Sequence, residues 1–132
     1  IADVRGDVLH QLLRIARETL LSELRPLVPA HARYALAMIA NAMAIAEREA
    51  EVGDAPAAAA LMRLASLYER PARNLSGEAL HTALAEADRE LITDIRAGRF
   101  DEGSSQHNAL IGHLCASVKA RLMISNPKSL DV

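Results

Sequence analysis

The sequence has 132 residues, with 15 Lys and Arg against 17 Asp and Glu, and its formal net charge of −2 leaves no excess positive charge for a phosphate backbone. Aromatic residues make up 2% of the chain, so there is no platform on which nucleic-acid bases would stack, and we expect no nucleic-acid partner. No uncharged apolar stretch reaches the ~20 residues that a membrane span requires, and the single Cys115 cannot form an internal disulfide. We therefore expect one soluble domain over residues 1–132, in the bacterial cytoplasm and without a membrane partner.

Apolar residues recur with the helical period in five segments, and strand-like alternation is almost absent, so the pattern predicts an all-α fold. The first helix is expected at about residues 7–24, with Asp7 as its N-cap and with Pro26 and Pro29 beyond its end. Its predicted core face consists of Leu9, Leu12, Leu13, Ala16, Leu20 and Leu24, widened by Val8 and Ile15.

The second helix is expected over residues 30–52, and Gly53 is a natural residue to end it. This helix is apolar on nearly all sides, which is typical of a helix surrounded by others. Its many alanines would let neighbouring helices approach closely. We expect this segment, Ala30–Val52, to lie at the centre of the bundle or in a subunit interface.

Three more helices are expected at about residues 56–69, 77–97 and 105–124, with Asp54 capping the first of them and Gly98 ending the second. Their predicted core faces are Leu61, Leu64, Leu67 and Tyr68; Leu80, Leu84, Ala87, Leu91 and Ile95; and Ile111, Leu114, Cys115, Val118 and Leu122. Residues 125–132 are expected to be a non-helical tail. Short connections favour antiparallel neighbours, so the prediction is a single-domain bundle of about five, mostly antiparallel helices.

Three polar residues of the second helix stand seven residues apart. Tyr34, Asn41 and Arg48 therefore share one face of the helix, among apolar neighbours. Burying an amide and a guanidinium there is costly unless both are hydrogen-bonded, so both are predicted to have partners.

Two interpretations of this stripe stay open. In the first it is a buried seam, in which Asn41 bonds backbone carbonyls and Arg48 pairs with a carboxylate such as Glu18 or Glu23. In the second it lines a cleft, with Arg33 or Arg48 receiving an anionic group that the other polar side chains orient.

Other candidate sites have simpler explanations. Asp7 and His10, like Glu78 and His81, have the spacing of carboxylate and imidazole ligands in di-iron bundles. Each acid, however, lies in the first turn of its helix, where capping and the helix dipole account for it, so we expect no metal and no cofactor. Cys115 is predicted to be a core residue.

Two remaining observations bear on chemistry. Arg63, Arg70 and Arg73, around the end of the third helix, are a weaker candidate for an anion-binding patch. No hydrolase, kinase or dehydrogenase motif occurs, so we assign no catalytic residues; enzymatic activity stays open, and a non-catalytic role is favoured.

The chain resembles a bacterial domain of unknown function that occurs alone, or fused to or encoded beside aminoglycoside-phosphotransferase-like kinases and acyl-CoA dehydrogenases. The resemblance lies in GDVLHQLLRIARETLLSELRPLVP (residues 6–29), RYALAMIANAMAIAERE (33–49), IRAGRFD (95–101) and KARLMISNPKSL (119–130). It implies a small helical domain associated with those enzymes and brings no catalytic residues. It also fits a chain that opens at Ile1 without methionine, since such a domain can follow another.

These observations lead to two functional hypotheses. The first is a non-catalytic accessory domain that binds another protein, or a second copy of itself, beside a kinase-like or acyl-CoA-metabolising enzyme. The alternative is a binding protein or enzyme subunit for a small anionic ligand, such as a CoA or phosphate ester, which Arg33, Tyr34, Asn41 and Arg48 would hold.

Overall fold

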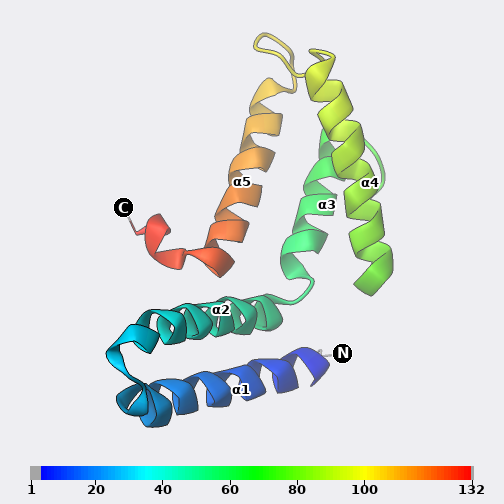
Figure 1. Ribbon diagram of the computed structural model, residues 1–132. Coiled ribbons are helices and arrows are strands. Elements are labelled where there is room, and N and C mark those ends of the chain that lie inside the picture. The colour runs from blue at the N-terminus through cyan, green and yellow to red at the C-terminus, as the bar shows by residue number, and fades with distance from the viewer. Residues whose placement is uncertain (1–3, 132) are drawn as a thin grey trace. The chain divides into compact units, whose positions relative to one another are not determined.

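A computed structural model describes residues 4–131 and confirms the all-α fold: this part of the chain contains five α-helices and no strand (Figure 1). The helices are α1 (Val4–Thr19), α2 (Arg33–Val52), α3 (Ala55–Leu67), α4 (Gly77–Arg96) and α5 (His107–Ser125). A short 3-10 helix, Pro127–Leu130, lies in the segment predicted to be a tail. No helix in residues 4–131 is both long and apolar enough to cross a membrane.

The internal contacts of the chain group into two compact units. The first comprises residues 4–53 and 124–127, and the second residues 54–123 and 128–131. A single domain with the second helix at its centre therefore remains a prediction.

The first unit is a helical hairpin. Beyond α1 the chain continues as a π-helical turn, Leu20–Leu24, and two short 3-10 segments, Arg25–Leu27 and Ala30–Ala32. Pro26 and Pro29 lack the N–H that a continued α-helix would need, so α1 ends here and the chain reverses into α2. At the far end of α2, Gly53 adopts a φ of 55° and its N–H bonds the carbonyl of Glu49 at 3.2 Å. Gly53 is thus the helix-ending residue that the sequence predicted.

The face that α1 turns to α2 is not the predicted one. Leu36, Ala40 and Ala44 are the buried residues of α2. On α1 the protected positions are Gly6, His10, Leu13 and Arg17, and Leu20 of the π-helical turn continues this face. The prediction of an apolar core face through Leu9 and Leu12 is wrong, because both side chains are about half exposed. The small alanines of α2 accept a mixed face of α1 at close range, and polar contacts complete the interface.

These polar contacts centre on Glu47 of α2. Its main-chain carbonyl lies 3.2 Å from Nδ1 of His10, and its carboxylate accepts a hydrogen bond of 3.3 Å from Nε of Arg14. The side chains of His10 and Arg14 also contact each other, at 2.6 Å. His10 therefore has a structural role between the two helices.

In the second unit α3 and α4 run parallel. Their N-termini are joined by Asp54, and their C-termini by a hydrogen bond of 2.6 Å from the hydroxyl of Tyr68 to Asp94. The connection over residues 68–76 makes this possible, because the seven residues that follow the turn at 68–69 can span ~23 Å, more than the ~20 Å length of a 13-residue helix. This pair is an exception to the antiparallel arrangement expected from short loops. Helix α5 runs antiparallel to α3, since Gln106 bonds the carbonyl of Leu67 while Ser117 lies beside Arg63.

Asp54 does not cap the helix that follows it. Its side chain makes no capping hydrogen bond to α3. Instead Oδ2 accepts the N–H of Gly77 at 2.9 Å, and Oδ1 lies 3.1 Å from Nε2 of His81. The prediction that Asp54 caps its own helix is therefore wrong, and the carboxylate stabilises the first turn of α4 instead.

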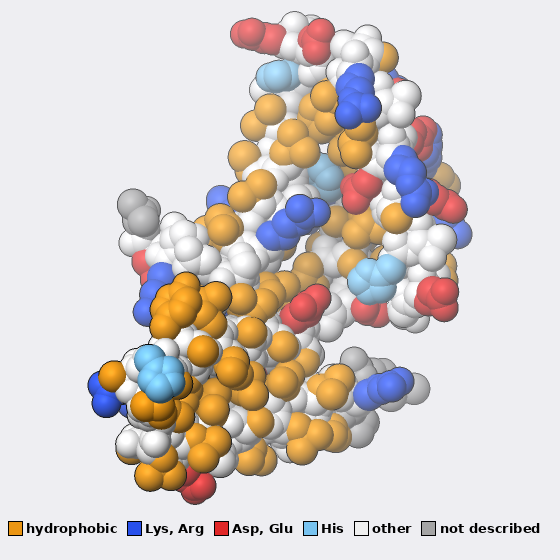
Figure 2. Space-filling model, in the orientation of Figure 1, with side chains coloured by type: hydrophobic (Ala, Val, Ile, Leu, Met, Phe, Trp, Pro, Cys, Tyr) orange, Lys and Arg blue, Asp and Glu red, His pale blue; other side chains and the backbone are white. Residues whose placement is uncertain are grey.

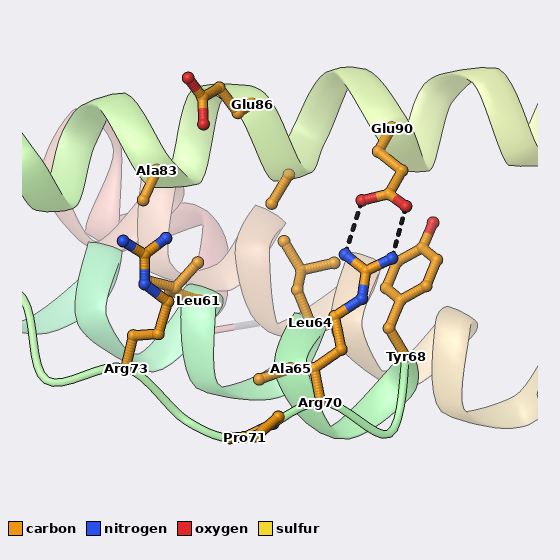
Figure 3. Close-up of a pocket in the computed structure, with 11 residues that line it drawn as sticks. Leu61, Leu64, Ala65, Tyr68, Arg70, Pro71, Arg73, Ala83, Glu86 and Glu90 are labelled. Carbon is orange, nitrogen blue, oxygen red and sulfur yellow. Dashed lines mark hydrogen bonds and ion pairs between the residues drawn. The ribbon is translucent and has the colours of Figure 1, made fainter.

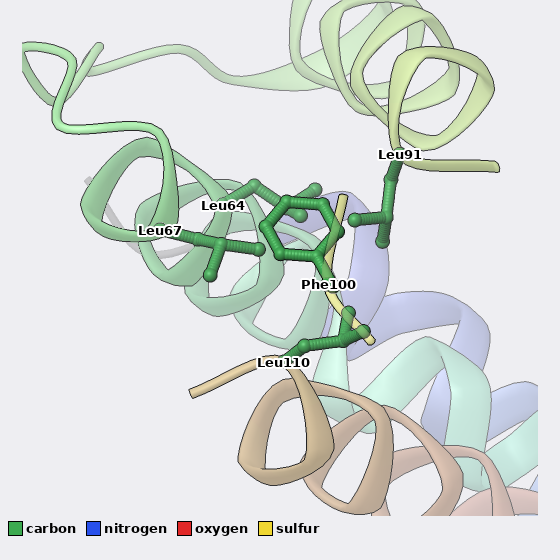
Figure 4. Packing of buried hydrophobic residues seen from close by; sticks show 5 residues of the cluster. All are labelled: Leu64, Leu67, Leu91, Phe100 and Leu110. Carbon is green, nitrogen blue, oxygen red and sulfur yellow. The ribbon is translucent and has the colours of Figure 1, made fainter. Parts of the chain in front are cut away.

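The core of the second unit consists of two adjoining clusters. Figure 4 shows the first, formed by Leu64, Leu67, Leu91, Phe100 and Leu110, with the phenyl ring of Phe100 among leucines of α3, α4 and α5. The second consists of Leu61, Leu80 and Ala83. The predicted core faces of α3 and α4 are confirmed at their leucines, apart from the half-buried Leu84.

The predicted core face of α5 is wrong by about one residue. Leu110 and His113 are its buried residues, whereas Ile111, Val118 and Cys115 are exposed. Apolar residues occur around most of α5, so the sequence pattern alone does not select the face that packs.

Candidate functional site

A cavity of about 450 Å³ is lined by α3, α4 and the 68–76 connection. Its apolar lining consists of Leu61, Leu64, Ala65, Pro71, Ala83 and Ala87, and its polar lining of Tyr68, Arg70, Arg73, Glu86 and Glu90 (Figure 3). A volume of this size is within the range of small-molecule pockets. We call it the α3–α4 cavity.

One end of this cavity is closed by an ion pair. Arg70 donates from Nη1 and Nη2 to the two carboxylate oxygens of Glu90, at 2.8 and 2.6 Å, as the two dashed lines in Figure 3 show. The guanidinium also lies over the ring of Tyr68, 4.6 Å from its centroid. The hydrogen bonds from Arg70 hold the pKa of Glu90 below its ordinary value. Arg70 and Glu90 therefore satisfy each other, and neither offers a free charge to a ligand.

Tyr68 is likewise committed to the fold. Its hydroxyl donates to Oδ2 of Asp94, which also accepts a hydrogen bond of 3.2 Å from Arg99. Its ring meets that of Phe100 edge to face, with centroids 5.9 Å apart. Burial, followed by the hydrogen bond to Asp94, raises the pKa of Tyr68 well above 10, so the hydroxyl is not a base near neutral pH.

The opposite end of the cavity carries Arg73. Figure 3 shows its guanidinium beside Leu61 and below Ala83, pointing into the space between the helices. Within residues 4–131 the structure records no hydrogen bond or ion pair of this side chain. The predicted patch of three arginines is therefore wrong as a unit: Arg70 is paired, Arg73 lines this cavity, and Arg63 lies in another.

That other cavity, about 640 Å³, is a groove lined by α3, α4 and α5. Inside it, Nε of Arg63 donates to Nδ1 of His113 at 3.2 Å, and Nη2 donates to the hydroxyl of Ser117 at 3.3 Å. His113 is only 5% exposed. Burial, and after it the charge of Arg63, lowers the pKa of His113, while Asp88 acts in the opposite direction. Because Arg63 donates to both His113 and Ser117, the two are organised around a cation and do not form a nucleophile–base pair with each other.

The residues predicted to bind a ligand lie elsewhere, on α2, and line neither cavity. Arg33 and Asn41 are exposed, and Tyr34 is 77% exposed. The interpretation of the stripe as a buried seam is wrong for Tyr34 and Asn41, because α2 packs through Leu36, Ala40 and Ala44 and the stripe lies about 100° around the helix from that face. Their role in binding a ligand remains a prediction.

Arg48 is half-buried, and its partner differs from the expected one. Its Nε donates to the main-chain carbonyl of Ile124 at 2.6 Å, within the first unit, and not to the carboxylate of Glu18 or Glu23. Satisfying a helix-end carbonyl is a structural role that needs no ligand.

The two candidate metal pairs lie at separate structural contacts. His10 contacts Glu47, and His81 contacts Asp54. Residues 4–131 contain no cluster of three or more His, Cys, Asp or Glu side chains that would hold a metal ion.

These features define an all-α protein whose described residues form a helical hairpin and a three-helix unit, with the α3–α4 cavity and the groove between α3, α4 and α5 in the second unit. Residues 26–129 match the profile of a family described as a domain of unknown function (DUF6285), and the chain belongs to this family. The match begins after α1, although the resemblance noted in the sequence also included residues 6–25. Neither a curated protein nor a solved structure matches the chain.

Proposed function

We propose that this chain is a non-catalytic helical domain that binds another polypeptide through the exposed apolar side of α1, and that a second copy of the chain is the first partner to test. The observation that carries the proposal is a row of apolar side chains on α1. Val8, Leu12 and Ile15 are 50%, 59% and 61% exposed, and Leu9 flanks them. We call Val8, Leu12 and Ile15 the α1 ridge.

The ridge is exposed because α1 uses a different face within its own hairpin. His10, Leu13 and Arg17 face the packed side, half a helical turn away from the ridge. In Figure 2 hydrophobic side chains gather over the α1–α2 hairpin on the face in view. Contiguous exposed apolar surface of this kind marks interaction sites in soluble proteins.

The spacing of the ridge favours a helix as the partner. Its members are four and then three residues apart, the alternation with which coiled-coil helices present their seam. A helix carrying such a row can pair with the same row of a second copy, because a twofold interface uses one surface patch on both subunits. This argument supports self-association before any other partner.

The proposal that the chain is non-catalytic is supported by the hydrogen bonds that polar residues of the α3–α4 cavity make within the protein. Arg70 and Glu90 bond each other, and Tyr68 bonds Asp94. Catalytic groups, by contrast, need to face the space that a substrate would occupy.

We also propose which enzymes the chain accompanies and in which compartment it works. Its association with a kinase-like or acyl-CoA-metabolising enzyme is inferred from the resemblance to the bacterial domain of unknown function. Its location in the bacterial cytoplasm is inferred from the same resemblance and from Cys115, whose exposed free thiol suits a reducing compartment.

Light scattering of the purified chain over a range of concentrations tests self-association. We expect the mass to rise from that of one chain, 14.2 kDa, to that of two as the concentration increases through the micromolar range. A mass of one chain at every concentration would contradict pairing of the chain with itself.

A further inference from the structure

The groove lined by α3, α4 and α5 combines a cationic centre with apolar walls. Arg63 extends from α3 to bond His113 and Ser117 of α5. The apolar side chains of the lining include Ile92 and Ile95 of α4 and Leu114 and Val118 of α5. All of these residues belong to the second unit, so the groove is a feature of that unit alone.

The charge of Arg63 lacks a counterion within the unit. Its hydrogen-bond acceptors are an imidazole nitrogen and a hydroxyl, and in the described part of the chain no carboxylate is within ion-pair distance of it. Arg63 itself is half-buried. A guanidinium partly removed from water and bonded only to neutral groups is stabilised by an anion that reaches it.

The other charges that line the groove limit the anion. Asp88 of α4 and Arg121 of α5 both line it, and Asp88 acts electrostatically on His113. Two arginines and one acidic side chain give the groove a net charge of one positive unit, which favours a ligand with a single negative charge over one with two, such as a phosphate monoester. The apolar walls require that the rest of the ligand be apolar too.

We propose that this groove binds a small carboxylate with an apolar chain, the carboxylate resting on Arg63 and the chain lying against Ile92, Ile95, Leu114 and Val118. A groove of about 640 Å³ suits a small molecule. The proposal goes beyond the binding of a protein through α1, since it uses other helices and another class of ligand.

Calorimetric titration with decanoate tests the proposal, with decanol and acetate supplying the chain and the carboxylate separately. We expect decanoate to bind, and decanol and acetate each to bind at least about tenfold more weakly. Arg63→Gln is expected to weaken decanoate binding by about tenfold or more, since a hydrogen-bonded charge pair is lost. The matched control is Arg89→Gln, an exposed arginine of α4 that lines neither cavity, and it is expected to leave decanoate binding unchanged.

Three results would overturn the proposal: no decanoate binding, equal binding by decanol, or equal losses in the two arginine variants. Binding of an acidic amphipathic peptide without any binding of decanoate would overturn it as well. A measurement on the unaltered chain keeps the test decisive if Arg63→Gln does not fold. NMR of the imidazoles should show decanoate, but not decanol, shifting His113; a shift confined to His81, outside the groove, would contradict the assignment.

Discussion

Asp54 and Gly77 are joined across 23 residues: the carboxylate that directly precedes α3 accepts the first N–H of α4 at 2.9 Å. The two helices therefore start at the same end of the unit. That hydrogen bond from Gly77, with His81 as the second cause, holds the pKa of Asp54 below its ordinary value of 3.8.

Asp54→Ala should lower the melting temperature of the chain, because the first turn of α4 loses an acceptor for its N–H. The carboxylate has a lower pKa in the folded chain than in the unfolded one, so its contribution is present above pH 3.8 and is lost as the pH falls below that value. Thermal unfolding followed by circular dichroism at pH 7 and at pH 3 measures both effects. Glu51→Ala, which removes an exposed acid at the end of α2, is the control. An equal decrease in melting temperature in both variants would contradict the stabilisation of α4 by Asp54.

Leu64 tests the core of the three-helix unit. It is 2% exposed and packs with Phe100, so Leu64→Ala should reduce the free energy of unfolding by about 2–5 kcal/mol. Urea denaturation gives this value. Met62→Ala is the matched control on the same helix, because Met62 is 60% exposed and should change stability by less than about 1 kcal/mol. Similar losses in the two variants would show that α3 packs through another face.

How far the sequence predicts this fold depends on whether the signal is local. Gly53 and Gly98 act on the backbone at their own positions, and the helix ends that they indicate are found in the structure. The direction of α4 relative to α3 is not local, because a nine-residue connection is compatible with both directions. The partner of Asp54 is not set by a local signal either, because a carboxylate before a helix predicts a cap on that helix alone.

The packed faces of the helices were likewise predictable only in part. On α4 one apolar stripe predominates, and Leu80 and Leu91 are buried as predicted. Helix α5 carries apolar residues around most of its circumference, whereas α1 has one apolar side but packs through the edge of it. The packed faces of these two helices include His113 and His10, which no apolar pattern would select. The groove centred on Arg63 was missed for this reason, although the sequence did mark Arg63 as a candidate anion ligand.

Glu69 provides a stabilising prediction. It ends α3 with a φ of 53°, a left-handed conformation, and the next N–H, of Arg70, bonds the carbonyl of Ala65 at 2.8 Å. Glycine adopts this conformation without a steric penalty, so Glu69→Gly should increase the free energy of unfolding by about 1 kcal/mol. Urea denaturation measures the change, with Glu69→Ala as the control for loss of the side chain. A destabilised glycine variant would contradict the left-handed end of α3.

His113 should make stability depend on pH in a particular direction. Burial and the Arg63 cation place its folded pKa below 6.5, whereas Asp88 alone raises it. The unfolded chain has the ordinary pKa of 6.5 at this imidazole. Between that value and the lower folded pKa, the unfolded chain binds the proton and the folded chain does not, so the free energy of unfolding decreases as the pH falls from 6.5 to the folded pKa. NMR titration of the imidazole measures the folded value. In Arg63→Gln that value should move up towards 6.5, and no change would show that the cation does not act on the ring.

The most direct test of binding through α1 is sedimentation velocity on two variants that place the same charge at two equally exposed positions. Leu12 in the α1 ridge is 59% exposed, and Met62 on α3 is 60% exposed. We predict that Leu12→Glu shifts the chain to the monomer, raising the dissociation constant about tenfold or more, whereas Met62→Glu sediments as the unaltered chain does. Equal association of all three proteins, or an equal loss in both variants, would contradict the claim that the α1 ridge is the binding surface.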